Sequence, residues 1–133
     1  MFTQALIRSW ILAAALLCAA SLMAHHGTFV SYDSEHPITV KATITEFHFT
    51  NPHIQIYFDV TDDKGVVTHW SAEGPDPAVW VAGGWGRKRS EAALAPGTKV
   101  TITLNPARNG KPVASGTKII LENGQRVGPG GGE

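Results

Sequence analysis

Apolar and polar residues alternate with a period of two along much of this chain after residue 37. In "PITVKATITEF" every second residue from Ile38 to Ile44 is apolar, and the residues between them are polar. The stretch "HIQIYFDV" repeats the alternation, and its apolar positions are Ile54, Ile56, Phe58 and Val60. Because successive side chains of a strand point to opposite faces, this period predicts half-buried β-strands. The chain must therefore build a sheet with one apolar face.

Further segments complete a strand-rich order. After the turn sequence "TDDKG", the stretch "VVTHWSAE" is a third strand, while "APGTKVTITL" and "VASGTKIIL" supply a fourth and a fifth. Between the third and fourth, Asp76 is a suitable N-cap and Pro77 a suitable first helical residue, which predicts a short helix over 77–82. This order resembles the OB-fold, a small five-stranded Greek-key barrel. A small β-sandwich is the alternative that the same pattern allows.

The first 24 residues have the features of a secretory signal peptide. Arg8 precedes the apolar run from Ile11 to Ala20, and small residues follow up to Ala24. The run is shorter than the 20 or so apolar residues that span a bilayer, so we expect cleavage after Ala24. An uncleaved N-terminal anchor is the alternative. The predicted location is the periplasm or the medium, and the processed protein would not be an integral membrane protein.

Processing at this point sets the remaining boundaries and the charge. We expect an N-terminal arm over 25–36, a barrel domain over 37–124 and a disordered glycine-rich tail over 125–133. The single cysteine, Cys18, lies inside the signal peptide, so the processed chain would carry no disulfide. Its 10 basic and 11 acidic residues leave a net charge of −1. A nucleic-acid partner is not expected, since it requires a basic excess.

Several short signatures accumulate along this framework. They are "AHHG" at the predicted mature start, "TNPH" before the second strand, Trp70 with Glu73, "GW" at 84–85, and "APGTKV". Together they resemble a family of small exported bacterial proteins known only as a domain of unknown function, over about Ala24 to Gly124. The chain departs from the family pattern at Gly27, where serine is usual, and in the longer connection "GRKRSEAALA". The resemblance implies export and a barrel fold but no activity.

The paired histidines at the predicted mature start are the sharpest candidate for chemistry. After cleavage, His25 would offer its α-amino group and its imidazole to one metal ion, and His26 a further nitrogen. Among divalent ions, Cu(II) has the highest affinity for such donors. The sequence therefore predicts a Cu(II) site at this start, with a flexible polar start as the alternative.

His53 is the third candidate metal ligand. If the second and third strands pair so that Ile54 faces Ala72, then His53 falls opposite Glu73, about 5 Å away at Cβ. Glu73 could then orient the imidazole as a second-shell carboxylate. An ordinary polar cross-strand pair is the alternative. His36, His48 and His69 are interpreted as surface histidines.

Tryptophans and a basic stretch complete the candidates. Trp70 and Trp80 are expected in the core. Trp85, between glycines, is expected to be partly exposed, and with Arg87 of the "GRKRS" stretch it could contact a ligand. The simpler interpretation of "GRKRS" is a solvated loop.

Two hypotheses follow from these residues. In the first, the protein is an exported, non-catalytic binding module for a small ligand or a metal ion. In the second, it is a metal-free interaction domain that docks another envelope protein through a barrel face or an open strand edge. No nucleophile elbow, dinucleotide fingerprint or zinc-protease motif occurs in the sequence, so an enzyme is not expected.

Overall fold

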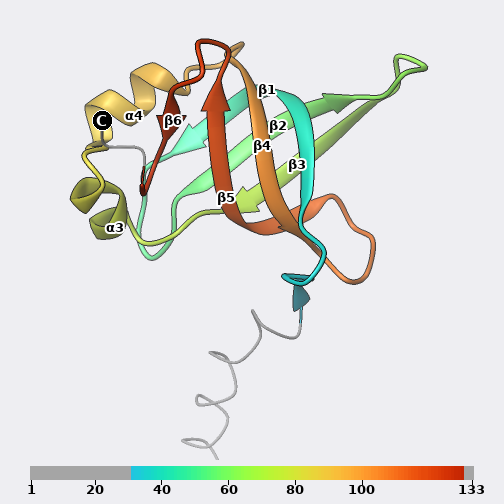
Figure 1. The fold of residues 1–133 in the computed structure, drawn as a ribbon, viewed down its shortest axis with the longest axis horizontal. Helices are drawn as coiled ribbons and strands as arrows, with labels where there is room; N and C mark the ends of the chain where they lie inside the picture. Colours follow the sequence, from blue (N-terminus) through green and yellow to red (C-terminus); the bar gives the residue numbers. More distant parts are fainter. Residues whose placement is uncertain (1–30, 131–133) are drawn as a thin grey trace, which may run out of the picture. The chain divides into compact units, whose positions relative to one another are not determined.

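The computed structural model describes residues 31–130 and contains a closed five-stranded β-barrel (Figure 1). Its strands are β1 (Ile38–His48), β2 (Gln55–Thr61), β3 (Val67–Glu73), β4 (Lys99–Pro106) and β5 (Val113–Leu121), joined by the short β6 (Arg126–Val127). The sheet order is β3-β2-β1-β4-β5-β6, and a parallel pairing of β3 with β5 closes the barrel. The predicted small barrel is confirmed.

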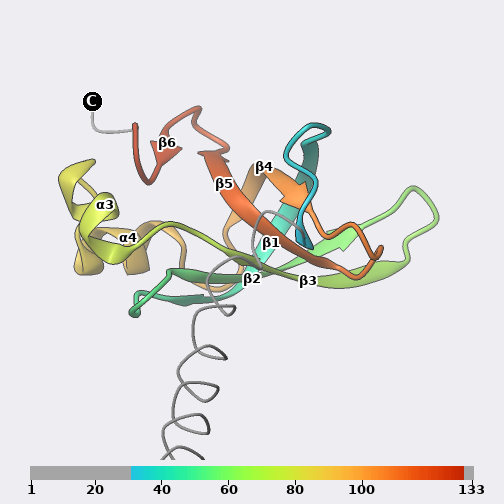
Figure 2. The same ribbon diagram turned by 90° about the horizontal axis from the view of Figure 1, so that it is seen from below.

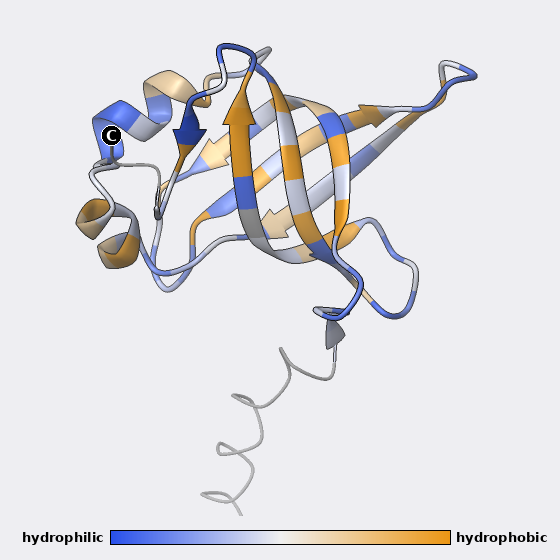
Figure 3. Cartoon of the chain, in the orientation of Figure 1, coloured by the Kyte–Doolittle hydropathy of each residue, from blue (hydrophilic) through white to orange (hydrophobic). Residues whose placement is uncertain are grey.

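The barrel interior is lined by the apolar positions of the period-two pattern. Ile44, Ile56 and Phe58 are no more than 1% exposed, whereas their neighbours along the strands face outward (Figure 3). Each such side chain contributes about 1.5–3 kcal/mol by leaving water. Trp80 belongs to the same core and Trp70 packs against it, as expected.

Two helices, α3 (Pro77–Ala82) and α4 (Arg87–Ala93), lie next to each other at one end of the barrel (Figures 1 and 2). The side chain of Asp76 caps α3 by accepting a hydrogen bond from the Ala78 amide, with Pro77 in the first helical position. The predicted bounds of α3 are therefore correct. Neither helix of the described residues is long and apolar enough to cross a membrane.

Helix α4 corrects the prediction of a solvated loop at "GRKRS". Ser90 is buried on its inner side and donates a hydrogen bond to the Gly86 carbonyl. On the outer side Arg87 forms an ion pair with Glu91, one helical turn later. Apart from alanines, this helix lacks an apolar residue, so the sequence carries no apolar stripe to reveal it.

The start of the predicted disordered tail is also ordered. Arg126 and Val127 pair with β5, and Val127 is only 2% exposed. The Gly128 backbone then packs against the Trp80 ring, where an added Cβ would lie 3.2 Å from Cζ2. The tail therefore covers part of the core as far as Gly128. Glycine can approach the Trp80 ring this closely, whereas a larger residue would displace the ring.

The turn between β2 and β3 extends beyond the neighbouring strands (Figure 1). One carboxylate oxygen of Asp62 accepts hydrogen bonds from the Lys64 and Val66 amides, and Gly65 has a φ of 81°. The turn composition that marks "TDDKG" in the sequence therefore forms a tight, side-chain-bonded turn.

Candidate functional site

The segment before β1 is attached to the connection between β4 and β5. Tyr32 forms a bridge with Ala107, and the Asp33 amide donates a 2.8 Å hydrogen bond to the Pro106 carbonyl. The Arg108 Nε atom donates to the Tyr32 carbonyl at 3.3 Å. The described end of the predicted N-terminal arm is therefore fixed to the barrel by backbone contacts and by the Arg108 side chain.

This attachment brings Tyr32 into the electric field of Glu73, the last residue of β3. The pKa of the Tyr32 phenol is raised, first by partial burial of the ring and second by the negative charge of Glu73. Glu73 is the residue that the sequence analysis assigns to orienting a metal ligand. The attached end of the arm is thus close enough to Glu73, one of the predicted site residues, for the charge of Glu73 to act on Tyr32.

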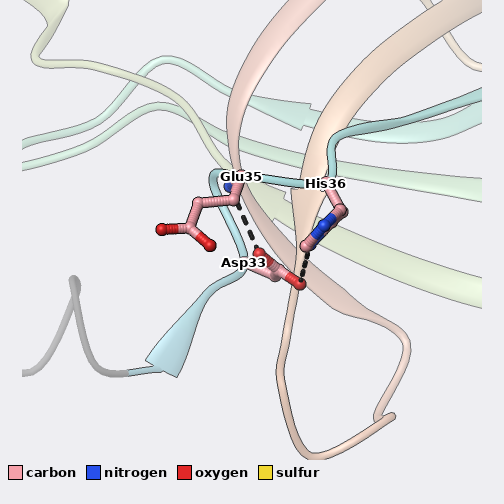
Figure 4. Close-up of side chains that lie close together, drawn as sticks. All are labelled: Asp33, Glu35 and His36. Atoms are coloured by element: carbon pink, nitrogen blue, oxygen red, sulfur yellow. Dashed lines mark hydrogen bonds and ion pairs between the residues drawn. The ribbon is translucent and has the colours of Figure 1, made fainter.

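Asp33, Glu35 and His36 form a compact turn on the same segment (Figure 4). The Asp33 carboxylate accepts hydrogen bonds from the His36 Nδ1 atom at 3.0 Å and from the Glu35 amide at 3.2 Å. An Arg108 nitrogen lies 3.6 Å from the same carboxylate. The ligand-type atoms of the three side chains all lie within 4.8 Å of one another.

The pKa of Asp33 is lowered by these partners. The hydrogen bond from His36 is the largest cause. Burial acts in the opposite direction and comes second, and the Glu35 amide and the charges of His36 and Arg108 then lower the pKa further. Asp33 is therefore an ionised carboxylate at neutral pH. An ionised carboxylate next to an imidazole is a donor set that a divalent cation can use.

Sequence reasoning missed this turn and treated His36 as an isolated surface histidine. The side chain is indeed 79% exposed. The signal that could have found the group is the spacing of Asp33, Glu35 and His36 within four residues. A single turn of chain can place such residues on one side.

The pairing of β2 with β3 corrects the predicted register by two residues. Glu73 faces Gln55, and Ile56 faces Ala72. Beyond this pair the Ile54 carbonyl accepts from the Gly74 amide, while the Ile54 amide donates to Pro75. His53 therefore lies in the β1–β2 loop, past the end of the ladder. Within residues 31–130 no hydrogen bond or ion pair joins His53 to Glu73.

The remaining candidates are placed as follows. His25 and His26 lie outside the described residues. Trp85 is 1% exposed, which corrects the expectation of partial exposure, and the Arg89 guanidinium covers its ring at 4.0 Å. Arg87 lies over the Phe49 ring at 5.0 Å. Trp85 and Arg87 thus support the helical end of the barrel, since each is engaged in packing.

Two other exposed histidines resemble His36 in having a carboxylate partner. His48 bonds Glu46 at 2.9 Å, and His69 bonds Asp59 across the β2–β3 ladder. Their side chains are 51% and 83% exposed, as expected of surface histidines. Both lie on strands, His48 at the end of β1 and His69 within β3.

The family model described as "Family of unknown function (DUF6152)" matches residues 13–118 of the chain. No curated protein matches the chain.

Proposed function

The chain belongs to this family of unknown function, DUF6152, and we propose that it is an exported, non-catalytic binding module that takes up one Cu(II) ion through its N-terminal arm. Export rests on the signal-peptide features of residues 1–24. The proposed mature start is His25. The barrel then serves as a rigid base to which the arm is attached.

The primary ligand is the mature N-terminus itself. The α-amino group and the imidazole of His25 belong to one residue, so they chelate a metal ion without bringing distant segments together. His26 adds a further nitrogen. Cu(II) is favoured because its affinity for nitrogen donors exceeds that of the other divalent first-row ions.

The observation that supports this proposal is the turn of Asp33, Glu35 and His36 on the same arm. Nine residues separate His26 from His36, a length of chain that can fold back on itself. His36 can turn its imidazole from Asp33 to the ion, at the cost of one exposed hydrogen bond. The positive charge of Arg108 repels a cation at Asp33, so we expect His36 and Glu35 to be better ligands than Asp33. We favour His36 over His53 because it lies on the arm that carries the chelate.

Copper titration of matched proteins tests the proposal. The processed form beginning at His25 is compared with a form that carries one additional alanine before His25. The extension keeps every imidazole but moves the amine, so affinity should fall by at least about tenfold, the equivalent of about 1.4 kcal/mol. His36→Gln should also weaken binding, whereas His48→Gln is the control, since His48 is likewise exposed and carboxylate-bonded. Equal affinity of the processed and extended forms would refute the chelate.

The mature terminus is measured first, by mass spectrometry of the exported protein. Cleavage after Ala24 gives His25 as the first residue. A start at Thr28 or beyond would remove both histidines and with them the proposed site.

One observation favours the second hypothesis, an interaction domain. Within the described residues, β3 pairs with β5 only from Ser71 to Glu73, so no described strand covers that edge at Val67–Trp70. Val67 of this edge is 46% exposed, and Val66, which precedes it, is 58% exposed. Such an edge can accept an added strand. Replacing both His25 and His26 separates the two functions, because only copper binding should be lost.

A further inference from the structure

A groove of about 460 Å³ crosses the outer face of the barrel, where β1 lies between β2 and β4. It is distinct from the arm, since none of its lining residues precedes Lys41. The lining includes threonines from β1, β2 and β4, which are Thr43, Thr61 and Thr101. Its volume lies within the usual range for small-ligand sites, roughly 300–1,000 Å³.

The strand register arranges three kinds of polar group in a row across the groove. Thr43 of β1 faces Asp59 on β2 and Lys99 on β4. Neighbouring strands are about 4.8 Å apart, so a carboxylate, a hydroxyl and an ammonium group follow one another at that spacing. Two residues before Thr43 on β1, Lys41 faces Thr101 and adds a second ammonium–hydroxyl pair.

The charges of the groove balance. Lys41 and Lys99 stand against Asp59 and Glu122. Neither lysine takes part in an ion pair of the described residues. Asp59 is bonded to His69. A highly charged ligand of either sign gains little from such a surface, whereas an uncharged ligand rich in hydroxyl groups can use both the lysine donors and the hydroxyl and carboxylate acceptors.

An aromatic ring extends this face along β2. Tyr57 lies two residues before Asp59, so both side chains point outward, about 6.6 Å apart along the strand. The side chain is 38% exposed. The His48 ring packs edge-on against it, with centroids 5.6 Å apart at 84°. Tyr57 is therefore held in place with part of its surface open to solvent.

We propose that this groove and Tyr57 together bind an oligosaccharide. The hydroxyl groups of a sugar both donate and accept hydrogen bonds, which fits the alternating lysine, threonine and carboxylate groups. The C–H face of a neighbouring sugar ring packs on an aromatic surface such as Tyr57. The site is separate from the copper site and does not depend on it.

Titration of the isotope-labelled full-length processed protein, followed by amide NMR spectra, tests the proposal. The sugar probes are chitotetraose and cellotetraose, and inorganic phosphate is the comparison. We expect saturable shifts of the amides of Lys41, Thr43, Tyr57, Asp59 and Lys99 with at least one of the sugars. Phosphate should cause no such shifts at equal concentration.

Matched variants assign the contacts. Tyr57→Ala should weaken sugar binding about fivefold or more by removing the ring contact. Thr43→Val keeps the shape of the side chain but removes its hydroxyl, so it should weaken binding as well. The control is Val81→Ala, which shortens another exposed apolar side chain on α3. Unchanged amide spectra away from the substitution show that each variant is folded.

Three results would overturn the proposal. The first is the absence of saturable shifts with either sugar, and the second is shifts confined to residues outside the groove. The third is phosphate binding that depends on Lys41 and Lys99 and excludes the sugars, which would make the groove an anion site. Equal sugar affinity of Tyr57→Ala and the parent would likewise contradict a joint site of the groove and Tyr57.

Discussion

The Tyr32 phenol and the Glu73 carboxylate lie close enough to interact electrostatically, although one precedes the barrel and the other ends β3. Burial of Tyr32 and the charge of Glu73 both raise the pKa of the phenol. The pKa of Tyr32 thus depends on the charge of Glu73 at the end of β3. This pair gives a direct spectroscopic report on the arm.

Replacing Glu73 should lower the pKa of Tyr32 toward its ordinary value of 10.0. In Glu73→Gln the negative charge that opposes tyrosinate formation is absent, while burial of the ring remains. The ultraviolet absorbance of tyrosinate as a function of pH measures this change, and Tyr32→Phe identifies the transition. Glu122→Gln is the control. An unchanged titration in Glu73→Gln would mean that the arm is not held beside β3.

The same pair has a consequence for stability at high pH. Because the pKa of Tyr32 is higher in the folded than in the unfolded protein, its contribution to stability is complete below about pH 10. That contribution is lost as the pH rises through the folded-state pKa. Tyr32→Phe should therefore reduce the alkaline loss of stability, measured by denaturant unfolding at several pH values.

Copper affinity should fall as the pH drops through about 6. The ligands must be unprotonated, and the ordinary pKa values are about 6.5 for imidazole and about 7.7–8.0 for an α-amino group. The fall should be steeper for the processed form than for the alanine-extended form, in which the amine is displaced from the site. Calorimetric titrations between pH 5 and pH 8 measure it. A pH-independent affinity would contradict histidine ligation.

Ile56→Asp should destabilise the barrel by several kcal/mol. Ile56 is 0% exposed, so the substitution buries a carboxylate without a partner. Gln55→Asp, at the neighbouring outward position, is the control and should cost far less. Urea unfolding of the two variants makes the comparison. A stable Ile56→Asp protein would show that the strand faces are reversed.

Gly128→Ala should cost more stability than Gly124→Ala. Both glycines have positive φ values, 93° and 83°, so each alanine pays for the left-handed backbone, about 1–2 kcal/mol. Only at position 128 does the added methyl group also meet the Trp80 ring, at 3.2 Å, which adds about 1 kcal/mol or more. Thermal unfolding should therefore show a lower midpoint for Gly128→Ala. Equal midpoints would mean that the tail does not pack on Trp80.

The faces of the strands could be predicted from the sequence, but the pairing of β2 with β3 could not. Alternation places Ile56 inside and Gln55 outside, which the burial of Ile56 confirms. A shift of two residues keeps every side chain on the same face, so the pattern cannot distinguish the predicted register from the observed one. The choice is made at the end of the ladder, where Ile54 bonds to both Gly74 and Pro75.

The helical end and the arm were harder to predict for different reasons. Trp85 lies in the core, and the Arg89 side chain of α4 covers its ring, a contact that leaves no apolar period in the sequence. The turn of Asp33 and His36 depends on hydrogen bonds between side chains that are polar in any arrangement. Periodicity predicts which residues face the core, whereas the Arg89–Trp85 and His36–Asp33 contacts depend on the path of the backbone.

The barrel closes through the parallel pairing of Ser71–Glu73 with Val113–Ser115, two segments that are far apart in the chain. The entropy of closing so long a loop must be overcome before this pairing contributes any stability. Hairpins such as β1–β2 and β2–β3 can form early, because their partners are neighbours in sequence. The folding rate should therefore be limited by the arrival of β5 at β3. A chain that is cut or stalled before Val113 would leave the β3 edge exposed to aggregation.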